Sequence, residues 1–378
     1  MVDPSPHLYR ILGQKRGIPD ELIDRAIRTS LAARQHSARP ILSLNHLSQM
    51  TGASYMYLRR IVERRTDPYA DIALPKKSGG VRPISAPEPV LMDVQRWILR
   101  ESLSSLINHP ASFAYQRGHS IVDCARAHIG ATWLVKMDIH DFYGSVSEKC
   151  VYKVFRGRGY ENLVSLELAR ICTRARMNGS EYSGSVRYSA IPTYSSESMG
   201  VLPQGGPTSG ALANAVATPL DADLVGIASH YRFEYTRYSD DLTFSSSSTF
   251  DRNQAAEFIR EVGQAIRSGG FELHKRKTRI ISPGSRKVVL GLLLDADRVR
   301  LLPEFRRRIE VHIRGVRTFG VAHHVESRKF DSVNGLVNYV DGCLSFALAV
   351  DPMWTSRVRT TWEAALSSSG FLREQLGP

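Results

Sequence analysis

The feature that most constrains this 378-residue chain is a pair of adjacent aspartates, Asp240 and Asp241, between two short apolar runs. Hydropathy alternates on both sides of Ser239 and Asp240, which predicts two strands joined by a tight turn. Adjacent carboxylates repel each other and strands are poor in aspartate, so folding alone gives little reason for this pair. A divalent cation would relieve the repulsion. Ordinary turn chemistry, in which Ser and Asp are common, is the alternative.

A third carboxylate, Asp138, lies inside the apolar run 134–139, a pattern typical of a buried strand. Asp141 follows shortly after and suits a local role, such as capping the next helix. Placed beside the turn, Asp138 would complete an all-oxygen cluster with the two adjacent aspartates. Such a donor set suits Mg²⁺, so the sequence predicts a magnesium site shared by two distant segments.

The charge balance indicates a polyanionic partner. The chain has 50 Lys and Arg against 37 Asp and Glu, a formal net charge of +13, which suits nucleic acid better than an acidic small molecule. An anionic membrane would also suit this charge. We find no long apolar span, signal-peptide pattern or basic amphipathic anchor, so we expect no membrane contact and a cytoplasmic location. Four widely spaced cysteines suggest neither a zinc site nor a disulfide framework.

Other short motifs carry polar groups suited to a nucleotide. A hairpin is predicted over residues 74–84, where glycines allow close approach and Lys76, Lys77 and Arg82 could hold a triphosphate. A solvated basic turn is the alternative. Gln204 lies in a Pro- and Gly-containing turn before a helix, and its amide can bind a sugar or base edge. His128 is expected to make a structural hydrogen bond rather than bind a metal.

The flanking regions read mainly as helices. Residues 44–60 have the spacing of a helix-turn-helix, but a helical pair packed on the main domain is the favoured interpretation. Residues 270–280 predict a basic strand. From residue 303 the chain is helical and basic, which favours contact with a phosphate backbone over a merely solvated face. The arginines concerned are Arg306, Arg307, Arg308, Arg314 and Arg317.

The order of these motifs resembles that of the reverse transcriptases, over roughly residues 70 to 300. The matching segments are 76–82, 138–143, 202–205, 238–241, 277–278 and 290–291. Six motifs in one order make chance agreement very unlikely. Residues 171–173, 204–209 and 235–245 look most like the bacterial retron enzymes.

This resemblance implies an α+β right-hand polymerase with fingers, a palm of antiparallel sheet with helices on one face, and a helical thumb. Its expected parts are N-terminal helices and fingers at 1–112, palm at 113–145, an insertion at 146–198, palm again at 199–298, and thumb at 299–378.

The resemblance also implies roles for individual residues. Asp138 and Asp240 would bridge two Mg²⁺ ions that Asp241 assists, with Ile139 as a further metal ligand. Lys76, Lys77 and Arg82 would neutralise the triphosphate, and Asp141 would also contact the nucleotide. Tyr143 would stack under the deoxyribose and exclude a 2′-hydroxyl, Gln204 would contact the incoming nucleotide, and Lys277 would protonate the pyrophosphate.

A retron enzyme would copy a structured noncoding RNA with dNTPs, start from a 2′-hydroxyl of that RNA, and leave branched RNA–DNA. Antiphage defence is the implied biology. No second acidic cluster follows the thumb, so a host RNase H is an expected partner; an effector protein is left open. The nearest alternative is another bacterial defence or abortive-infection reverse transcriptase. A nucleic-acid-binding protein that kept the palm but lost catalysis, and a helix-turn-helix regulator built on residues 44–60, are alternatives from another class.

Overall fold

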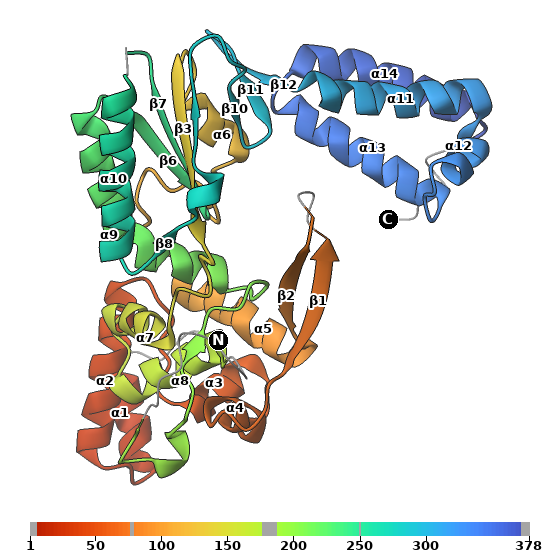
Figure 1. Cartoon of the computed structure of the whole chain (residues 1–378). Helices are drawn as coiled ribbons and strands as arrows, with labels where there is room; N and C mark the ends of the chain where they lie inside the picture. The colour runs from red at the N-terminus through yellow and green to blue at the C-terminus, as the bar shows by residue number, and fades with distance from the viewer. Residues whose placement is uncertain (1–5, 76–78, 176–186, 249–250, 372–378) are drawn as a thin grey trace.

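The computed structural model of the chain describes residues 6–75, 79–175, 187–248 and 251–371. Figure 1 shows N-terminal helices and a long hairpin at one end, a central sheet with its helices, and a helical region that projects from the far end of the sheet above the hairpin. This confirms the predicted α+β architecture, and the three parts are called fingers, palm and thumb below.

The palm is an antiparallel five-stranded sheet in the order β6-β7-β3-β8, with β9 also pairing with β3. Its strands are β3 (Trp133–His140), β6 (Glu234–Tyr238), β7 (Asp241–Ser246), β8 (Glu272–Leu273) and β9 (Arg279–Ile281). The β6–β7 register pairs Tyr238 with Asp241 and leaves Ser239 and Asp240 as the turn. The predicted hairpin is therefore confirmed.

Two long helices, α9 (Ser209–His230) and α10 (Arg252–Ser268), cover one face of this sheet. Phe244 of β7 stacks on Tyr235 of β6 and meets Phe258 of α10 edge-on, so aromatic rings fill the layer between sheet and helix. By length and composition α9 could cross a membrane, but 44% of its most apolar 18-residue window is buried inside the protein. Its contacts with β6 and α10 are those of a core helix.

The short helix α6 (Ile121–Arg126) packs against β6, and His128 follows it. The imidazole is hydrogen-bonded through Nε2 to Thr236 and through Nδ1 to Ser245, each at 2.7 Å. Burial lowers the pKa of His128 to about 4, so the ring is neutral at pH 7. The expected structural role of His128 is confirmed.

The fingers combine helices with a two-stranded hairpin. The helices are α1 (Pro6–Lys15), α2 (Asp20–Gln35), α3 (Leu44–Thr51), α4 (Tyr55–Val62), α5 (Pro89–Ile98), α7 (Glu148–Gly157) and α8 (Asn162–Cys172), with a π-helical turn at Leu99–Leu103 and a 3-10 turn at Pro192–Tyr194. The hairpin strands are β1 (Tyr69–Pro75) and β2 (Val81–Pro87), and a small pair joins β4 (Arg174–Ala175) to β5 (Gly200–Val201). Helices α3 and α4 bury Leu47 and Leu58 in the main core, which fits the packed helical pair.

The thumb has a hydrophobic core of its own, continuous with the palm through Leu134. A three-stranded sheet links it to the palm: β10 (Val288–Val289), β11 (Leu292–Leu294) and β12 (Val299–Leu301). Its helices are α11 (Pro303–Phe319), α12 (Val321–Ser327), α13 (Val333–Leu348) and α14 (Pro352–Ser368). Trp362 of α14 is fully buried between these helices.

The continuous basic strand predicted for residues 270–280 is wrong. Only β8 and β9 are strand, and the 3-10 turn Lys275–Lys277 separates them. Lysine is depleted in strands, and a turn keeps these adjacent charges in solvent. The main-chain N–H of His274 donates to the carbonyl of Asp138 at 2.8 Å, so the turn begins beside the predicted metal site.

Candidate active site

Asp240 lies at the tip of the β6–β7 hairpin. Ser239 before it has a φ of +59°, the left-handed conformation that tight hairpin turns require. The Ser239 carbonyl accepts a 3.2 Å hydrogen bond from the guanidinium of Arg237. The Asp240 carbonyl accepts one of 2.9 Å from the N–H of Ile139. The turn is therefore held both from its own strand and from β3.

Asp138 and Asp241 lie directly opposite each other across β3 and β7. Paired residues project from the same face of a sheet. The neighbours of Asp138, Met137 and Ile139, belong to the core shared with α9 and α10. Because strand residues alternate between faces, Asp138 and Asp241 project to the opposite face. Sheet register thus brings together the two acidic segments that the sequence predicts to meet.

The electrostatics of this cluster fit a divalent cation. Burial raises the pKa of Asp240, and the charge of Asp138 raises it further. Burial also raises the pKa of Asp241, with a further increase from Asp240. The Lys277 ammonium lies 2.8 Å from Oδ2 of Asp138, and Lys136 is a second positive charge that acts on Asp241. These carboxylates oppose one another's ionisation, and a bound cation would relieve that repulsion. Carboxylate oxygens are also among the ligands that Mg²⁺ prefers.

Among the described residues, no three His, Cys, Asp or Glu side chains are arranged so that they could hold a metal ion. Asp138 faces Lys277 instead. The assignment of Asp138, Ile139, Asp240 and Asp241 as metal ligands therefore stays a prediction.

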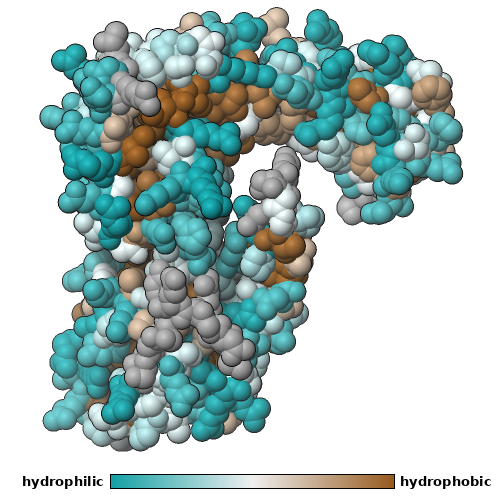
Figure 2. All heavy atoms as spheres, in the orientation of Figure 1, coloured by the Kyte–Doolittle hydropathy of each residue, from teal (hydrophilic) through white to brown (hydrophobic). Residues whose placement is uncertain are grey.

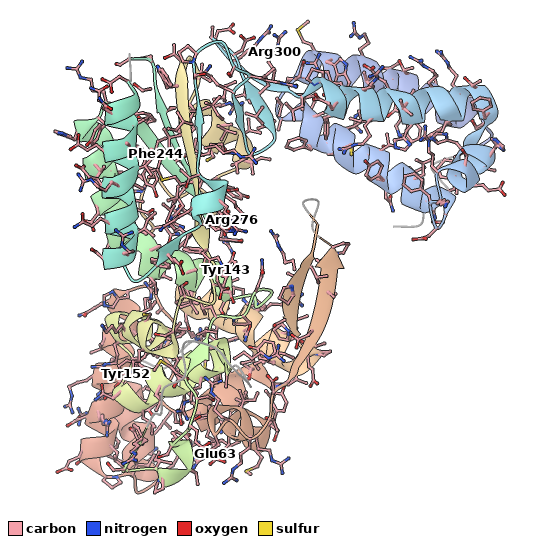
Figure 3. The ribbon with its side chains drawn as sticks, viewed as in Figure 1. Glu63, Tyr143, Tyr152, Phe244, Arg276 and Arg300 are labelled. Atoms are coloured by element: carbon pink, nitrogen blue, oxygen red, sulfur yellow. The ribbon has the colours of Figure 1, made fainter. Side chains whose placement is uncertain are left out.

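A cavity of about 910 Å³ opens between the palm and the β1–β2 hairpin. It gathers most of the residues predicted to act on metal or nucleotide: Arg82, Asp138, Ile139, Asp141, Tyr143, Gln204, Asp240 and Lys277. The space-filling view shows the molecule hollowed between hairpin, palm and thumb (Figure 2). Figure 3 places Tyr143 at the junction of palm and fingers. Residues from both sides of the hollow therefore face one space.

Three predicted residues are not in this set. Lys76 and Lys77 lie outside the described residues, although Pro75 and Gly79 on either side of them line the cavity. Asp241 is half-buried beside Asp138 in the sheet and does not line the cavity.

Two histidines of the cavity were not predicted. His140 ends β3 and His274 follows β8, with their ring centroids 5.6 Å apart. His140 is the last residue of the strand that carries Asp138, and His274 directly follows a strand paired with it; those positions were the only signal available in the sequence.

Arg237 was also missed, as a residue that supports the turn. Its buried guanidinium donates to both carboxylate oxygens of Asp221, at 2.7 and 2.6 Å, and to Asn214 at 2.8 Å and Ser112 at 3.1 Å. A usable signal existed: Arg237 and Asp221 each interrupt an apolar pattern, one on β6 and one on α9. Opposite charges buried in two such elements point to a pair.

The five thumb arginines lie on α11 and differ in their surroundings. Arg306 pairs with the carboxylate of Asp351 and lies 5.2 Å from the ring centre of Trp354. Arg307 and Arg308 are exposed and line a shallow hollow of about 310 Å³ together with His312 and Arg328. Arg314 and Arg317 are exposed farther along the same helix. Contact of the five with nucleic acid stays a prediction.

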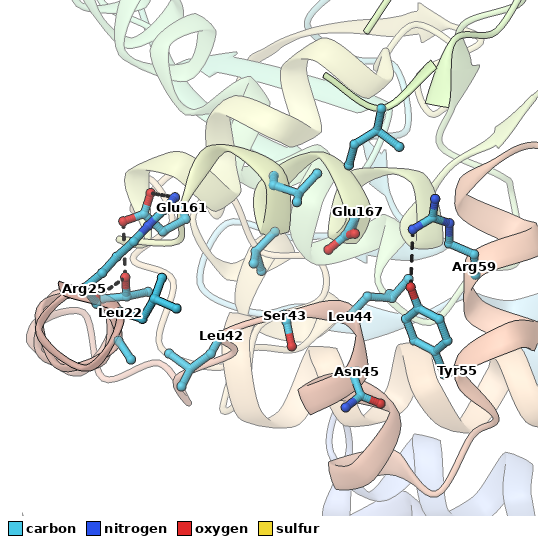
Figure 4. Close-up of a pocket in the computed structure, with 15 residues that line it drawn as sticks. Leu22, Arg25, Leu42, Ser43, Leu44, Asn45, Tyr55, Arg59, Glu161 and Glu167 are labelled. Carbon is cyan, nitrogen blue, oxygen red and sulfur yellow. Dashed lines mark hydrogen bonds and ion pairs between the residues drawn. The ribbon is translucent and has the colours of Figure 1, made fainter. Parts of the chain in front are cut away.

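A further cavity, of about 480 Å³, lies among α2, α3, α4 and α8 (Figure 4). Arg25 and Glu161 form a 3.3 Å ion pair in its wall, and the buried Glu167 accepts a 2.6 Å hydrogen bond from Tyr194. None of its lining residues also lines the cavity at the aspartates. It is therefore separate from the candidate active site.

The sequence model of the family described as reverse transcriptase (RNA-dependent DNA polymerase) matches residues 74–316. The retron Ec86 reverse transcriptase of Escherichia coli is 30% identical over 82% of this chain and 86% of its own length. The retron Mx162 reverse transcriptase of Myxococcus xanthus is 33% identical over 70% of this chain, which spans only 56% of that enzyme.

Among solved structures, telomerase from Candida albicans, in complex with a fragment of telomeric RNA, aligns with a TM-score of 0.44 and 12% identity, over 82% of this chain and 64% of that one. A likeness at this level adds nothing to the assignment. The family match spans most of the chain. It includes every residue that lines the cavity. The chain belongs to the reverse transcriptases, in their retron-type branch.

Proposed function

We propose that this chain copies a structured noncoding RNA into single-stranded DNA, starting from a 2′-hydroxyl of that RNA and leaving a branched RNA–DNA product. The observation that carries the proposal is the 910 Å³ cavity, where Asp138 and Asp240 face the same space as Arg82, Tyr143 and Gln204. Acids that can hold metal ions, a cation for phosphate and groups for a sugar and base are the parts that nucleotide transfer needs.

Reverse transcriptases use divalent metal ions, and here Asp138, Asp240, Asp241 and Ile139 would hold two Mg²⁺. Bound there, the ions would activate the primer hydroxyl and neutralise the charge developing on the phosphates. Arg82, with Lys76 and Lys77, would bind the triphosphate. Lys277, whose side chain is 54% exposed, lies in the cavity wall and would donate a proton to the departing pyrophosphate.

The remaining cavity residues would orient the incoming dNTP. Tyr143 would lie under the deoxyribose, and Gln204 and Asp141 would contact the nucleotide from the fingers side of the cavity. The exposed arginines of α11 would track the RNA backbone as it leaves the palm.

The wider partners follow from the same proposal. A host RNase H would remove template RNA. The protein would act in the cytoplasm, in antiphage defence, and an effector protein is a further candidate partner. The retron relatives support the RNA template and the DNA product.

The test is the nucleic acid that copurifies with the protein expressed from its native locus with flanking DNA. It is treated with RNase, the DNA is sequenced, and its 5′ end is tested for a 2′,5′ bond to a ribonucleotide that a debranching enzyme cleaves. One discrete, branched species, absent with Asp240→Asn, is expected.

Heterogeneous or absent DNA, with extension of an added RNA template intact, would overturn the retron product and favour another bacterial defence reverse transcriptase. Loss of both would favour a nucleic-acid-binding protein without catalysis.

A further inference from the structure

Three hydroxyl groups form a chain beside the catalytic turn. The Tyr143 hydroxyl lies 3.1 Å from Oγ of Ser239 and is also hydrogen-bonded to the hydroxyl of Tyr115. The Ser239 hydroxyl in turn hydrogen-bonds to the carboxylate of Asp240. These residues come from three separate segments, so the fold places the chain of hydroxyls.

The direction of this hydrogen-bond chain follows from its last member. An ionised carboxylate only accepts, so Ser239 donates to Asp240. Each hydroxyl has one proton to donate, so Tyr143 donates to Ser239 and Tyr115 donates to Tyr143. The whole chain therefore points toward Asp240, and aligned hydroxyls of this kind strengthen one another.

Both anchors of Tyr143 have a constrained backbone. Ser239 is fixed in the turn by its left-handed φ and by the hydrogen bond from Arg237 to its carbonyl. Tyr115 also has a positive φ, +58°, and its ring lies flat on Gly210, where an added Cβ would lie 2.5 Å from Cγ of Tyr115. Only glycine at the start of α9 allows this contact. Tyr115 is 56% exposed, so the Gly210 contact and the hydrogen bond to Tyr143 are what place its ring.

The ring of Tyr143 packs edge-on against Phe142 and against the core, and its hydroxyl adds two hydrogen bonds at the far end. Its ring lines the active-site cavity, and its centroid lies 6.5 Å from that of Tyr115 in an edge-on arrangement. An aromatic ring has two soft torsions, and two hydrogen bonds at its far end restrict both. The hydroxyl bonds thus fix where the ring stands relative to Asp240.

We propose that Ser239 and Tyr115 are positioning residues that fix the Tyr143 ring at one distance from Asp240, and that they thereby set the preference for deoxyribose over ribose triphosphates. The inference rests on the proposed role of Tyr143 beneath the sugar. Ribose carries a hydroxyl at the 2′ carbon where deoxyribose carries only a hydrogen. A ring that is free to move can make room for this hydroxyl, whereas an anchored ring excludes it. Positioning within about 0.5 Å decides such discrimination.

The experiment uses the full chain and measures kcat/KM for one dNTP and the matching rNTP on an RNA template. Ser239→Ala and Tyr115→Phe each remove one hydroxyl and leave the rest of the side chain in place. Each is expected to lower the dNTP-to-rNTP preference about fivefold, the worth of one ordinary hydrogen bond. Tyr143→Ala should lower it at least tenfold further.

A matched control is Ser145→Ala. The Ser145 hydroxyl donates to the carbonyl of Asp141 at 3.0 Å but takes no part in the chain of hydroxyls. Its removal should leave the sugar preference unchanged.

The outcomes separate the inference from the role on which it rests. If Tyr143→Ala keeps the wild-type preference, the proposed role of Tyr143 fails and the inference falls with it. If Tyr143→Ala loses the preference while Ser239→Ala and Tyr115→Phe keep it, only the inference is overturned. An equal fall in kcat/KM for both nucleotides would mean that the hydroxyls act on structure alone, and would also overturn it.

Discussion

The Ser239–Asp240 turn of the palm and helix α11 of the thumb both concentrate charge, but the fold holds that charge in different ways. At the turn, the carbonyls of Ser239 and Asp240 accept hydrogen bonds from β6 and β3 respectively, and Asp138 is buried with Lys277 against it. On α11 the exposed Arg307 extends from one face of one helix. The palm therefore presents a charge arrangement set before any ligand binds, whereas the thumb presents charges whose positions a partner can adjust.

A similar division occurs within α11 itself. Arg306 is engaged by Asp351 and Trp354, while its neighbour Arg307 is exposed in the hollow beside His312. Of two adjacent arginines, one can thus stabilise the packing of the thumb helices while the other is available to bind a ligand. The next four predictions test whether charge changes in the palm alter mainly the stability of the protein, and whether charge changes in the thumb alter mainly ligand binding.

The largest effect is expected from Arg237→Ala. Removing the guanidinium leaves Asp221 buried without its cation, which should destabilise the protein by about 3–5 kcal/mol in urea unfolding. Arg237→Lys, which keeps a charge but cannot form the two-pronged pair, should cost less. A loss below about 1 kcal/mol for the alanine variant would contradict the view that this network holds the turn.

The second prediction concerns pH and His128. Its pKa is lowered from 6.5 to about 4 by burial, so the unfolded chain binds a proton that the folded one refuses. Stability is therefore lost as pH falls from 6.5 to 4, by about 3 kcal/mol in total. Urea unfolding of His128→Gln, which cannot titrate, should show a correspondingly smaller loss. Equal losses in both proteins would contradict the buried neutral imidazole.

Metal-free Asp240→Asn should be more stable than the wild type at pH 7. The pKa of Asp240 is raised by burial and by Asp138, so its ionisation opposes folding at pH values above that pKa. Removing the charge is expected to gain about 1 kcal/mol, which for a chain of 378 residues is a Tm increase of about 1 °C. The gain should vanish as pH falls below 3.8, where the carboxyl becomes protonated in both states. A lower Tm would indicate that the carboxylate supports the fold.

The smallest effects separate the two arginines of α11. Arg307→Gln should weaken RNA binding and lower the salt dependence of log Kd by about 0.7–0.9, the value of one phosphate contact. Arg306→Gln should leave that slope unchanged and cost about 1 kcal/mol of stability through its ion pair and aromatic contact. Salt titrations of binding measure the first effect and urea unfolding the second. A slope change for Arg306→Gln would assign it to the RNA as well.

The sequence pointed to the candidate active site because the chemistry of these residues conflicts with folding. Asp138 breaks a buried strand pattern and Asp240 begins an acidic pair, so each needed a reason beyond packing. The strand of Asp138 follows from a continuous apolar run, and the strands on either side of Asp240 follow from alternation in hydropathy. The structure confirms the strands and brings the acids together across β3 and β7.

The supporting shell could not be predicted in the same way. The hydroxyl chain through Tyr115 and the network around Arg237 join residues far apart in sequence, and their types are ordinary in any fold. The pairing of Lys277 with Asp138 depends on the 3-10 turn at Lys275–Lys277, where local sequence favoured a strand. Such contacts depend on tertiary geometry, which periodicity does not encode.

The central claim is that the palm aspartates carry out RNA-directed DNA synthesis. The most direct test is extension of a primer on an RNA template with dNTPs and Mg²⁺, comparing the wild type with Asp240→Asn at equal concentration and with folding verified by the Tm. The account predicts extension by the wild type and a loss of at least 1000-fold in the variant, about 4 kcal/mol of transition-state stabilisation. Extension by a folded Asp240→Asn protein at near the wild-type rate would contradict it.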